Sequence, residues 1–192
     1  AKSTNISRFA AASSSSVYGN AETYPTTELA LPQPVSPYGV TKLASEHLCT
    51  LYAKNFGVPT VSLRYFTVYG PRQRPDMALR RMIDLSLTDK AFPLFGDGSV
   101  SRSFTYINDV VEANLAALLS DAPSGSVCNI ANESTASMTE LIDLVSSALG
   151  QPVRLDRLPA AAGDAERTGG SSELAQELLG WSPSTTLEQG VA

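Results

Sequence analysis

The sequence predicts an α/β protein with a parallel sheet, and three segments near its start carry that prediction. Residues 6–12 and 58–64 are short runs of small, apolar or β-branched side chains that indicate strands. Residues 37–56 lie between them, begin after Ser36 and stop at Gly57, with apolar residues at helical spacing. A strand, a helix and a second strand in this order favour parallel strands joined by a crossover helix.

The remaining elements follow from local signals along the chain. Residues 20–37 are rich in Pro and Thr and predict a loop, as do the small residues at 160–163. Asn108 is suited to cap a helix over 109–119, and Ser137 opens a capping-box pattern before another helix. Further helices are expected at 76–87, at 171–179 and from 187 onwards, and further strands at 92–95 and 127–130.

The composition is that of an ordinary globular protein. The chain has 192 residues, 43% hydrophobic and 17% charged, which suits one domain or two small ones. A net charge of −5 argues against nucleic acid as a partner, because phosphates need a basic surface. Cys49 and Cys128 lie far apart beside a single His, which argues against zinc and disulfides and favours the cytoplasm. No apolar run reaches membrane-spanning length and no signal peptide is visible, so no membrane partner is expected.

Tyr38 and Lys42 form the first candidate constellation. Residues four apart lie on one face of a helix, so the lysine ammonium is expected near the tyrosine ring. A nearby positive charge favours the phenolate and lowers a tyrosine pKa from about 10 towards the working range. Such a tyrosine can act as a general base. The alternative is a chance spacing, since a single Tyr-x-x-x-Lys is a weak signal.

The serine run at 13–16 is the second candidate. Four serines in a row often form a flexible linker, but here a predicted strand precedes them and Val17 and Tyr18 follow. A serine at the carboxyl end of a parallel strand stands where ligands bind in such sheets. Its hydroxyl could hydrogen-bond the substrate oxygen that a tyrosine deprotonates.

Five segments, in this order, resemble a known family. They are SSSSVYG at 13–19, SPYGVTK at 36–42, LRYFTVYGPRQRPDMA at 63–78, FGDGSVSRSFTYINDVV at 95–111 and LGWSPSTTLEQG at 179–190. The chain resembles the extended short-chain dehydrogenases/reductases that act on nucleotide sugars as NAD-dependent epimerases and dehydratases. Within that family it is most similar to the UDP-glucose (UDP-galactose) 4-epimerases.

The resemblance assigns catalytic and cofactor roles. It implies that Ser14 is the catalytic hydroxyl and that Tyr38 is the general base. Lys42 would hold the nicotinamide ribose of NAD and lower the Tyr38 pKa. Tyr65 would lie against the same cofactor.

The resemblance also assigns residues to a UDP-sugar substrate. Thr67 stands where many relatives carry an Asn that touches the sugar diphosphate, and Phe95 would border the uracil. Arg102 would pair with the diphosphate, because a planar guanidinium can bind phosphate oxygens bidentately. Without the family context, a surface salt bridge would be the preferred reading of Arg102. Relatives often carry an Arg just before Gly163-Asp164, and here Arg167 is the candidate to replace it.

The implied fold is the C-terminal part of a Rossmann-type parallel sheet plus a smaller α/β substrate-binding lobe. Residues 1–70 would supply late strands and helices of the NAD-binding domain. Residues 71–192 would be mainly the substrate-binding lobe, with 105–131 returning to the sheet. No GxxGxxG or GxGxxG pattern occurs, although relatives carry one before the catalytic serine. We therefore expect the chain to be a fragment that lacks the first four strands and has no epimerase activity by itself.

The serine run also favours one reaction type. Related 4,6-dehydratases and decarboxylases carry an acidic residue in this segment, whereas this chain has Ser15 and Ser16. Simple 4-epimerisation through transient oxidation is therefore expected. A dehydratase or decarboxylase relative, a non-catalytic UDP-sugar-binding module and a plain structural domain remain alternatives. Members of the family often form dimers through a helix bundle, so the resemblance implies a homodimer through the helix at 38–56.

Overall fold

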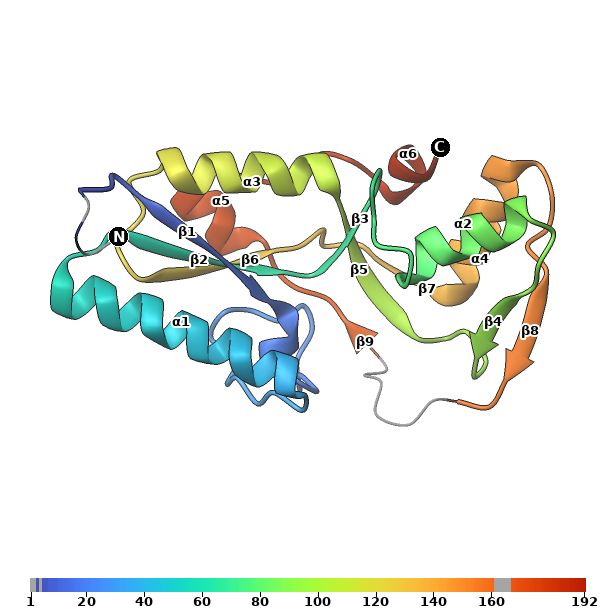
Figure 1. Ribbon diagram of the computed structural model, residues 1–192, viewed down its shortest axis with the longest axis horizontal. Coiled ribbons are helices and arrows are strands. Elements are labelled where there is room, and N and C mark those ends of the chain that lie inside the picture. The colour runs from blue at the N-terminus through green and yellow to red at the C-terminus, as the bar shows by residue number, and fades with distance from the viewer. Residues whose placement is uncertain (1–2, 4, 161–166) are drawn as a thin grey trace.

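The computed structural model describes residues 3, 5–160 and 167–192 and has two lobes side by side (Figure 1). The first lobe is built on three parallel strands in the order β1-β2-β6. Helix α1 covers one face of this sheet, and α3 and α5 cover the other (Figure 1). The bounds are β1 Phe9–Ser14, α1 Pro37–Phe56, β2 Thr60–Tyr65, α3 Ile107–Leu119, β6 Ser126–Ile130 and α5 Glu173–Leu179.

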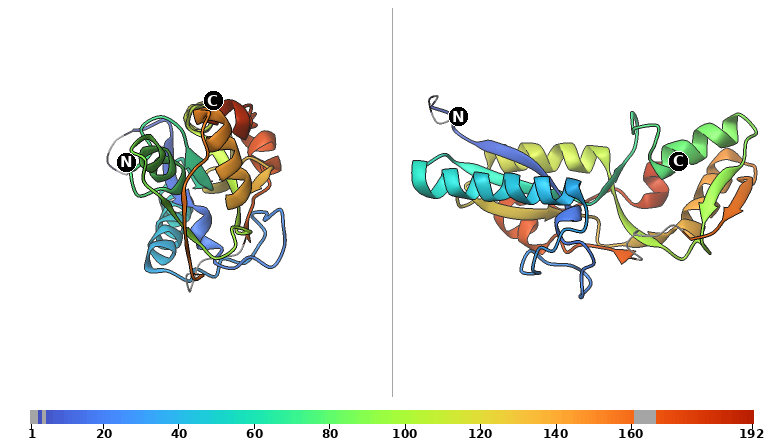
Figure 2. Two further views of the ribbon diagram at one scale, coloured as in Figure 1. Left: turned by 90° about the vertical axis from the view of Figure 1, so that its right-hand side faces the viewer. Right: turned by 60° about the horizontal axis from the view of Figure 1, so that its bottom comes forward.

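Helix α1 has the bounds that the sequence predicts, because both of its ends are determined locally. The Ser36 hydroxyl accepts a hydrogen bond from the Gly39 N–H at 3.1 Å, and Pro37 occupies the first turn. At the other end, Gly57 adopts a left-handed φ of 65° and donates to carbonyls of the last turn. The helix lies lengthwise along the sheet, as the right-hand view of Figure 2 shows.

The core of the first lobe lies between the sheet and α3 with α5. Its buried members include Val61 and Leu63 from β2 and Cys128 and Ile130 from β6. The buried carboxylate of Asp109, on α3, accepts from Ser184 Oγ at 2.8 Å and from the Thr185 N–H at 3.0 Å. Trp181 donates its indole N–H to the Asp109 carbonyl at 2.8 Å. Residues 181–185 are thereby tied to α3.

The second lobe combines short strands with two longer helices. Strands β4 and β8 pair in parallel, and β5 pairs with β3, β7 and β9. Tyr69, Met82, Phe104 and Leu141 are among the residues of its own buried core. The bounds are β3 Thr67–Tyr69, α2 Ala78–Leu87, β4 Phe92–Phe95, β5 Ser101–Tyr106, β7 Thr135–Ser137, α4 Met138–Leu149, β8 Leu155–Leu158, β9 Arg167–Thr168 and α6 Leu187–Val191.

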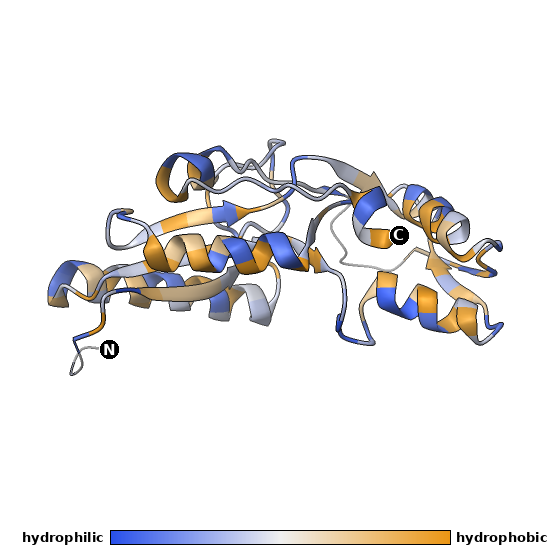
Figure 3. Ribbon diagram, turned by 90° about the horizontal axis from the view of Figure 1, so that it is seen from above, coloured by the Kyte–Doolittle hydropathy of each residue, from blue (hydrophilic) through white to orange (hydrophobic). Residues whose placement is uncertain are grey.

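Apolar side chains also remain on the surface of the first lobe. Figure 3 shows the mixed hydropathy of its helices. Exposed members include Leu48, Leu51 and Phe56 on α1 and Leu115 and Leu119 on α3. No strand among the described residues pairs with the outer edge of β1. Within the same residues, no helix is long and apolar enough to cross a membrane.

Several local predictions differ from the structure. The first strand spans 9–14 rather than 6–12, and the predicted Asn108 cap is wrong. Helix α3 begins at Ile107 because β5 runs directly into it, with Tyr106 at the N-cap position and no side-chain cap. Strands β3, β5, β7, β8 and β9 were not predicted; β3, β7, β8 and β9 have only two to four residues, and the six-residue β5 lacks a clear alternation of apolar and polar side chains. Of the predicted loop at 160–163, residues 161–163 lie outside the described residues.

Candidate active site

The first turns of α1 place the predicted Tyr–Lys pair on one face of the helix. The Lys42 ammonium lies 5.6 Å from the centroid of the Tyr38 ring. The same ammonium donates a hydrogen bond to the Ala12 carbonyl of β1 at 2.8 Å. Tyr38 is 54% exposed, so its phenol is open to a ligand. The four-residue spacing therefore places the Lys42 ammonium near the Tyr38 ring, as predicted. Lys42 also links α1 to β1.

The serine run ends a strand and begins a turn. Ser13 and Ser14 are the buried last residues of β1, and Ser15–Val17 form one 3-10 turn. Ser14 Oγ accepts the N–H of Ser16 at 3.2 Å. Because all three strands of the sheet are parallel, Ser14 stands at its carboxyl end, where such folds bind ligands. The linker interpretation is wrong.

Gly39 allows α1 to approach the serine run closely. A Cβ atom at this position would lie 2.5 Å from the Ser16 carbonyl oxygen and 2.9 Å from Pro34 Cβ. Both distances are shorter than real Cβ contacts, so a larger residue would push the helix away. The glycine between Tyr38 and the rest of the helix therefore keeps the tyrosine turn against the end of β1.

Tyr65 ends β2 beside Ser14, because the two residues are register partners on neighbouring strands. The Tyr65 hydroxyl donates to Asn114 Oδ1, on α3, at 2.8 Å. Burial raises the pKa of Tyr65 above its ordinary value, and the Asn114 hydrogen bond offsets this only in part. Tyr65 is therefore a neutral phenol at the carboxyl end of the sheet. Ser14 and Tyr65 thus end neighbouring strands, and the Tyr65 side chain is directed to α3, on the other face of the sheet from Tyr38 and Lys42 on α1.

The residues predicted to bind substrate lie on strands of the second lobe. Thr67 begins β3 and pairs with Phe104, and Phe95, which is 48% exposed, ends β4. Arg102 is on β5 and donates from Nη1 to the Ser101 carbonyl at 3.1 Å. These positions are compatible with a ligand that extends from the sheet end towards the second lobe.

Arg167 lies on β9, the strand next to Arg102. Arg102 is the register partner of Thr168, and Ser101 is the partner of Arg167. The Arg167 guanidinium lies 4.9 Å from the centroid of the Tyr24 ring, and the Tyr24 hydroxyl donates to the Arg167 carbonyl at 2.7 Å. The β5–β9 pairing puts the two predicted arginines on adjacent strands, but they are not register partners, so their side chains point to opposite faces of the strand pair. The neighbouring Gly163-Asp164 lies outside the described residues.

A buried polar network below Tyr38 and Lys42 was not predicted. Arg64, on β2, binds the Glu46 carboxylate bidentately, with Nε–Oε1 at 2.9 Å and Nη2–Oε2 at 2.7 Å. Both side chains are about 95% buried. Ser13 Oγ donates to the same carboxylate. The sequence signal that could have indicated Glu46 is its spacing, because it follows Lys42 by four residues and so lies on the same face of α1.

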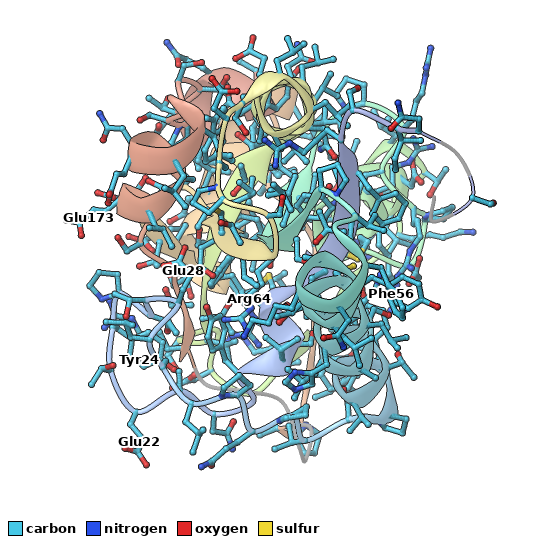
Figure 4. The ribbon with its side chains drawn as sticks, turned by 90° about the vertical axis from the view of Figure 1, so that its left-hand side faces the viewer. Glu22, Tyr24, Glu28, Phe56, Arg64 and Glu173 are labelled. Atoms are coloured by element: carbon cyan, nitrogen blue, oxygen red, sulfur yellow. The ribbon has the colours of Figure 1, made fainter. Side chains whose placement is uncertain are left out.

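The network continues through Arg64 to β6. Arg64 Nη1 donates to the Tyr18 hydroxyl at 2.8 Å, and that hydroxyl donates to Asn129 Oδ1 at 2.7 Å. Burial raises the pKa of Tyr18, with the charge of Arg64 opposing it. Burial likewise raises the pKa of Glu28, whose carboxylate accepts from the Asn129 N–H at 2.6 Å. Figure 4 shows Arg64 in the interior, with Glu28 nearby and Glu22 pointing outward.

Comparison with known proteins places these residues in context. The model of the NAD dependent epimerase/dehydratase family matches residues 1–131. YtcB of Bacillus subtilis, described as an uncharacterized UDP-glucose epimerase, is 42% identical over 97% of this chain and 59% of its own length. A probable UDP-glucuronate 4-epimerase of Rhizobium meliloti is 35% identical over 94% of this chain and 59% of its own length.

Solved structures agree with this similarity. A UDP-glucuronic acid 4-epimerase of Bacillus cereus, crystallised with UDP-glucuronic acid and NAD, superposes with a TM-score of 0.93 at 43% identity. That match covers 99% of this chain and 60% of the other. A UDP-glucose 4-epimerase of Thermotoga maritima, solved with UDP-glucose, gives a TM-score of 0.92 at 31% identity, over 97% and 62% of the two chains. The chain thus spans about three fifths of the length of these relatives.

Proposed function

Because the chain belongs to the NAD-dependent epimerase/dehydratase family, we propose that the protein is a UDP-sugar 4-epimerase. What supports this proposal is that Lys42 lies 5.6 Å from the Tyr38 ring and also binds the Ala12 carbonyl, two residues before Ser14 on β1. A hydroxyl donor, a phenol and an ammonium at one sheet end are the groups that reversible oxidation of a sugar alcohol needs.

In this mechanism Tyr38 removes the proton of the sugar C4 hydroxyl, and Ser14 holds that oxygen by a hydrogen bond. NAD, when bound, would supply the acceptor and then the donor of the C4 hydride, and inversion results when the 4-keto sugar presents its other face. Lys42 would hold the nicotinamide ribose, and Tyr38 gives its proton back to the sugar oxygen at the end of the cycle. The position of Tyr38 relative to β1 is restrained by the close approach at Gly39 and by the Lys42 hydrogen bond to Ala12.

The residues present fit the nicotinamide end of NAD. Lys42 binds the Ala12 carbonyl near the carboxyl end of β1, and Tyr65 ends β2 on the face that α3 covers; the carboxyl end of a parallel sheet is where α/β folds bind nucleotides. The sequence contains no glycine-rich loop for the pyrophosphate. The proposal therefore assigns to this chain the nicotinamide end of the cofactor site.

The UDP part of the substrate is assigned to the second lobe. Arg102 would bind the diphosphate with its fork of N–H donors, and Phe95 would border the uracil. Thr67 can donate one hydrogen bond to the same diphosphate. The register of β9 on β5 does not support Arg167 as a second cation there, because its side chain points to the opposite face from that of Arg102. The sequence predicts the UDP-glucose and UDP-galactose pair. The 43% identity to an epimerase crystallised with UDP-glucuronic acid favours UDP-glucuronate as the second candidate.

The decisive experiment is product analysis with the full-length protein that carries this sequence. UDP-glucose, UDP-galactose and UDP-glucuronate are incubated separately, and proton NMR follows inversion at C4. Inversion without loss of water or carbon dioxide supports the proposal and shows which sugar reacts. A 4-keto-6-deoxy sugar or a decarboxylated pentose would instead identify a dehydratase or decarboxylase. Binding of UDP without any turnover would identify a non-catalytic UDP-sugar-binding module.

We also propose that the protein forms a homodimer through α1, and that it acts in the cytoplasm. Leu48, Leu51 and Phe56 expose apolar surface on this helix, and Tyr52 packs on Phe56 with ring centroids 5.1 Å apart. Substitution of Leu51 by Glu would place a charge in such an interface. Analytical ultracentrifugation should then show a monomer, whereas an unchanged dimer would remove α1 from the interface.

A further inference from the structure

A single buried carboxylate links the helix that carries Tyr38 to the strand that carries Ser14. Tyr38, Lys42 and Glu46 follow one another at four-residue spacing on α1, so they form one stripe along the helix. Tyr38 is exposed at the near end of the stripe, and Glu46 is 4% exposed at the far end. One helix face thus runs from the candidate reacting phenol to a buried acid.

The carboxylate of Glu46 accepts hydrogen bonds from both strands that end at the site. Ser13 Oγ donates to Oε1 from β1, one residue before Ser14. Arg64 donates to both oxygens from β2, one residue before Tyr65. Glu46 therefore contacts Ser13, which precedes Ser14, and Arg64, which precedes Tyr65.

Arg64, the cation of this ion pair, is also held by Tyr18. The Arg64 guanidinium lies 4.7 Å from the centroid of the Tyr18 ring and donates to the Tyr18 hydroxyl. Tyr18 follows the serine turn, and its hydroxyl donates a hydrogen bond to Asn129 Oδ1 on β6. Among the described residues, every buried side-chain nitrogen or oxygen has a hydrogen-bond partner. The network is complete, so it has one favoured geometry.

We infer that Glu46 is a positioning residue of the proposed epimerase, which sets where α1 sits along β1 and so the distance between Tyr38 and Ser14. The inference rests on the proposed function for its kinetic consequence. A buried ion pair contributes little net stability compared with apolar residues, and specificity of geometry is its best-attested use. The Lys42 hydrogen bond to Ala12 restrains the same helix one turn nearer to Tyr38. Two anchors on one stripe prevent both sliding and rotation of the helix.

The test uses two substitutions in the full-length protein. Glu46→Asp keeps the charge and withdraws the carboxylate by one carbon–carbon bond, about 1.5 Å. Ser13→Ala removes one hydrogen bond and leaves the ion pair in place, so it preserves folding even where Glu46→Asp does not. Matched controls are Glu112→Asp on the exposed face of α3 and Ser45→Ala on the exposed face of α1.

Two readouts separate positioning from general loss of stability. We expect kcat for the UDP-sugar to fall about 10-fold or more in both variants, because small misplacements of reacting groups are costly. KM should stay within about two-fold of the wild-type value, because the UDP part is bound by the second lobe. Amide exchange in the Tyr38–Lys42 turns of α1 should rise at least about five-fold, with exchange in α4 unchanged.

The outcomes distinguish the inference from the proposed function. Turnover within two-fold of wild type in both variants, or equal acceleration of exchange in α1 and α4, would overturn the positioning role. A wild-type protein that inverts no UDP-sugar would overturn the proposed function. In that case the amide-exchange measurement alone decides: faster exchange in α1 of the variants, with α4 unchanged, would still show that Glu46 anchors the helix.

Discussion

Replacement of Gly39 by alanine should reduce catalysis far more than it reduces stability. The added Cβ would lie 2.5 Å from the Ser16 carbonyl oxygen, about 0.9 Å short of the 3.4 Å at which ordinary contact begins. Neither the Ser16 carbonyl nor Pro34 Cβ is the end of a flexible side chain, so α1 and the serine turn must separate. Tyr38 is in the first turn of α1, and the serine turn directly follows Ser14. Separating the two turns therefore moves Tyr38 relative to Ser14.

The magnitudes of the two effects differ. Overpacking of this kind costs about 1–3 kcal/mol, whereas the change from glycine to alanine in a helix recovers about 1 kcal/mol of propensity. The net free energy of unfolding should therefore fall by about 0–2 kcal/mol. A displacement approaching 1 Å between reacting groups can cost about 10²-fold in rate, so we expect kcat to fall by about 10- to 100-fold.

The assay compares kcat, KM and thermal unfolding of Gly39→Ala with those of the wild-type full-length protein. Thr41→Ala is the matched control, because Thr41 is exposed in the same helical region and its hydroxyl donates to the Tyr38 carbonyl of its own helix. The control should retain near-normal kcat. Turnover of Gly39→Ala within two-fold of wild type would show that the close approach does not set the Tyr38–Ser14 geometry.

Three further predictions concern individual side chains. Tyr38→Phe keeps the ring and removes the proton acceptor, so kcat should fall at least about 10²-fold while the protein still folds; near-normal turnover would remove Tyr38 from the mechanism. Arg102→Met should raise KM for the UDP-sugar about 10- to 100-fold, the scale of one charged hydrogen bond, with kcat changed much less; an unchanged KM would place the diphosphate elsewhere. Burial raises the pKa of the Cys128 thiol from 9.0 to about 12, so iodoacetamide at about pH 8 should alkylate the partly exposed Cys49 first, as mass spectrometry can measure. Because that pKa is raised in the folded protein, this thiol contributes stability below about pH 9 that is lost as the pH rises towards 12.

Helix bounds could be predicted from the sequence where the residues at each end determine them. Ser36 and Gly57 delimit α1, and the Ser137–Glu140 capping box opens α4 as predicted. Asn108 failed as a cap because a strand enters the helix without a loop, which single-residue preferences do not reveal. The unpredicted strand β5 carries Arg102 and owes its extended form to partners on β3, β7 and β9. Such a strand depends on partner strands that lie elsewhere in the chain, which local sequence signals do not reveal.

The sequence by itself determined the family and the pairing of Tyr38 with Lys42, because motif order and helical spacing are local properties of the chain. Tertiary structure alone decided that Ser14 lies beside Tyr65, since register between strands depends on how the whole sheet packs. It also decided that Glu46 is buried against Arg64 and Ser13. A glutamate on a helix is usually exposed, and only the approach of β1 and β2 supplies the donors that make its burial favourable.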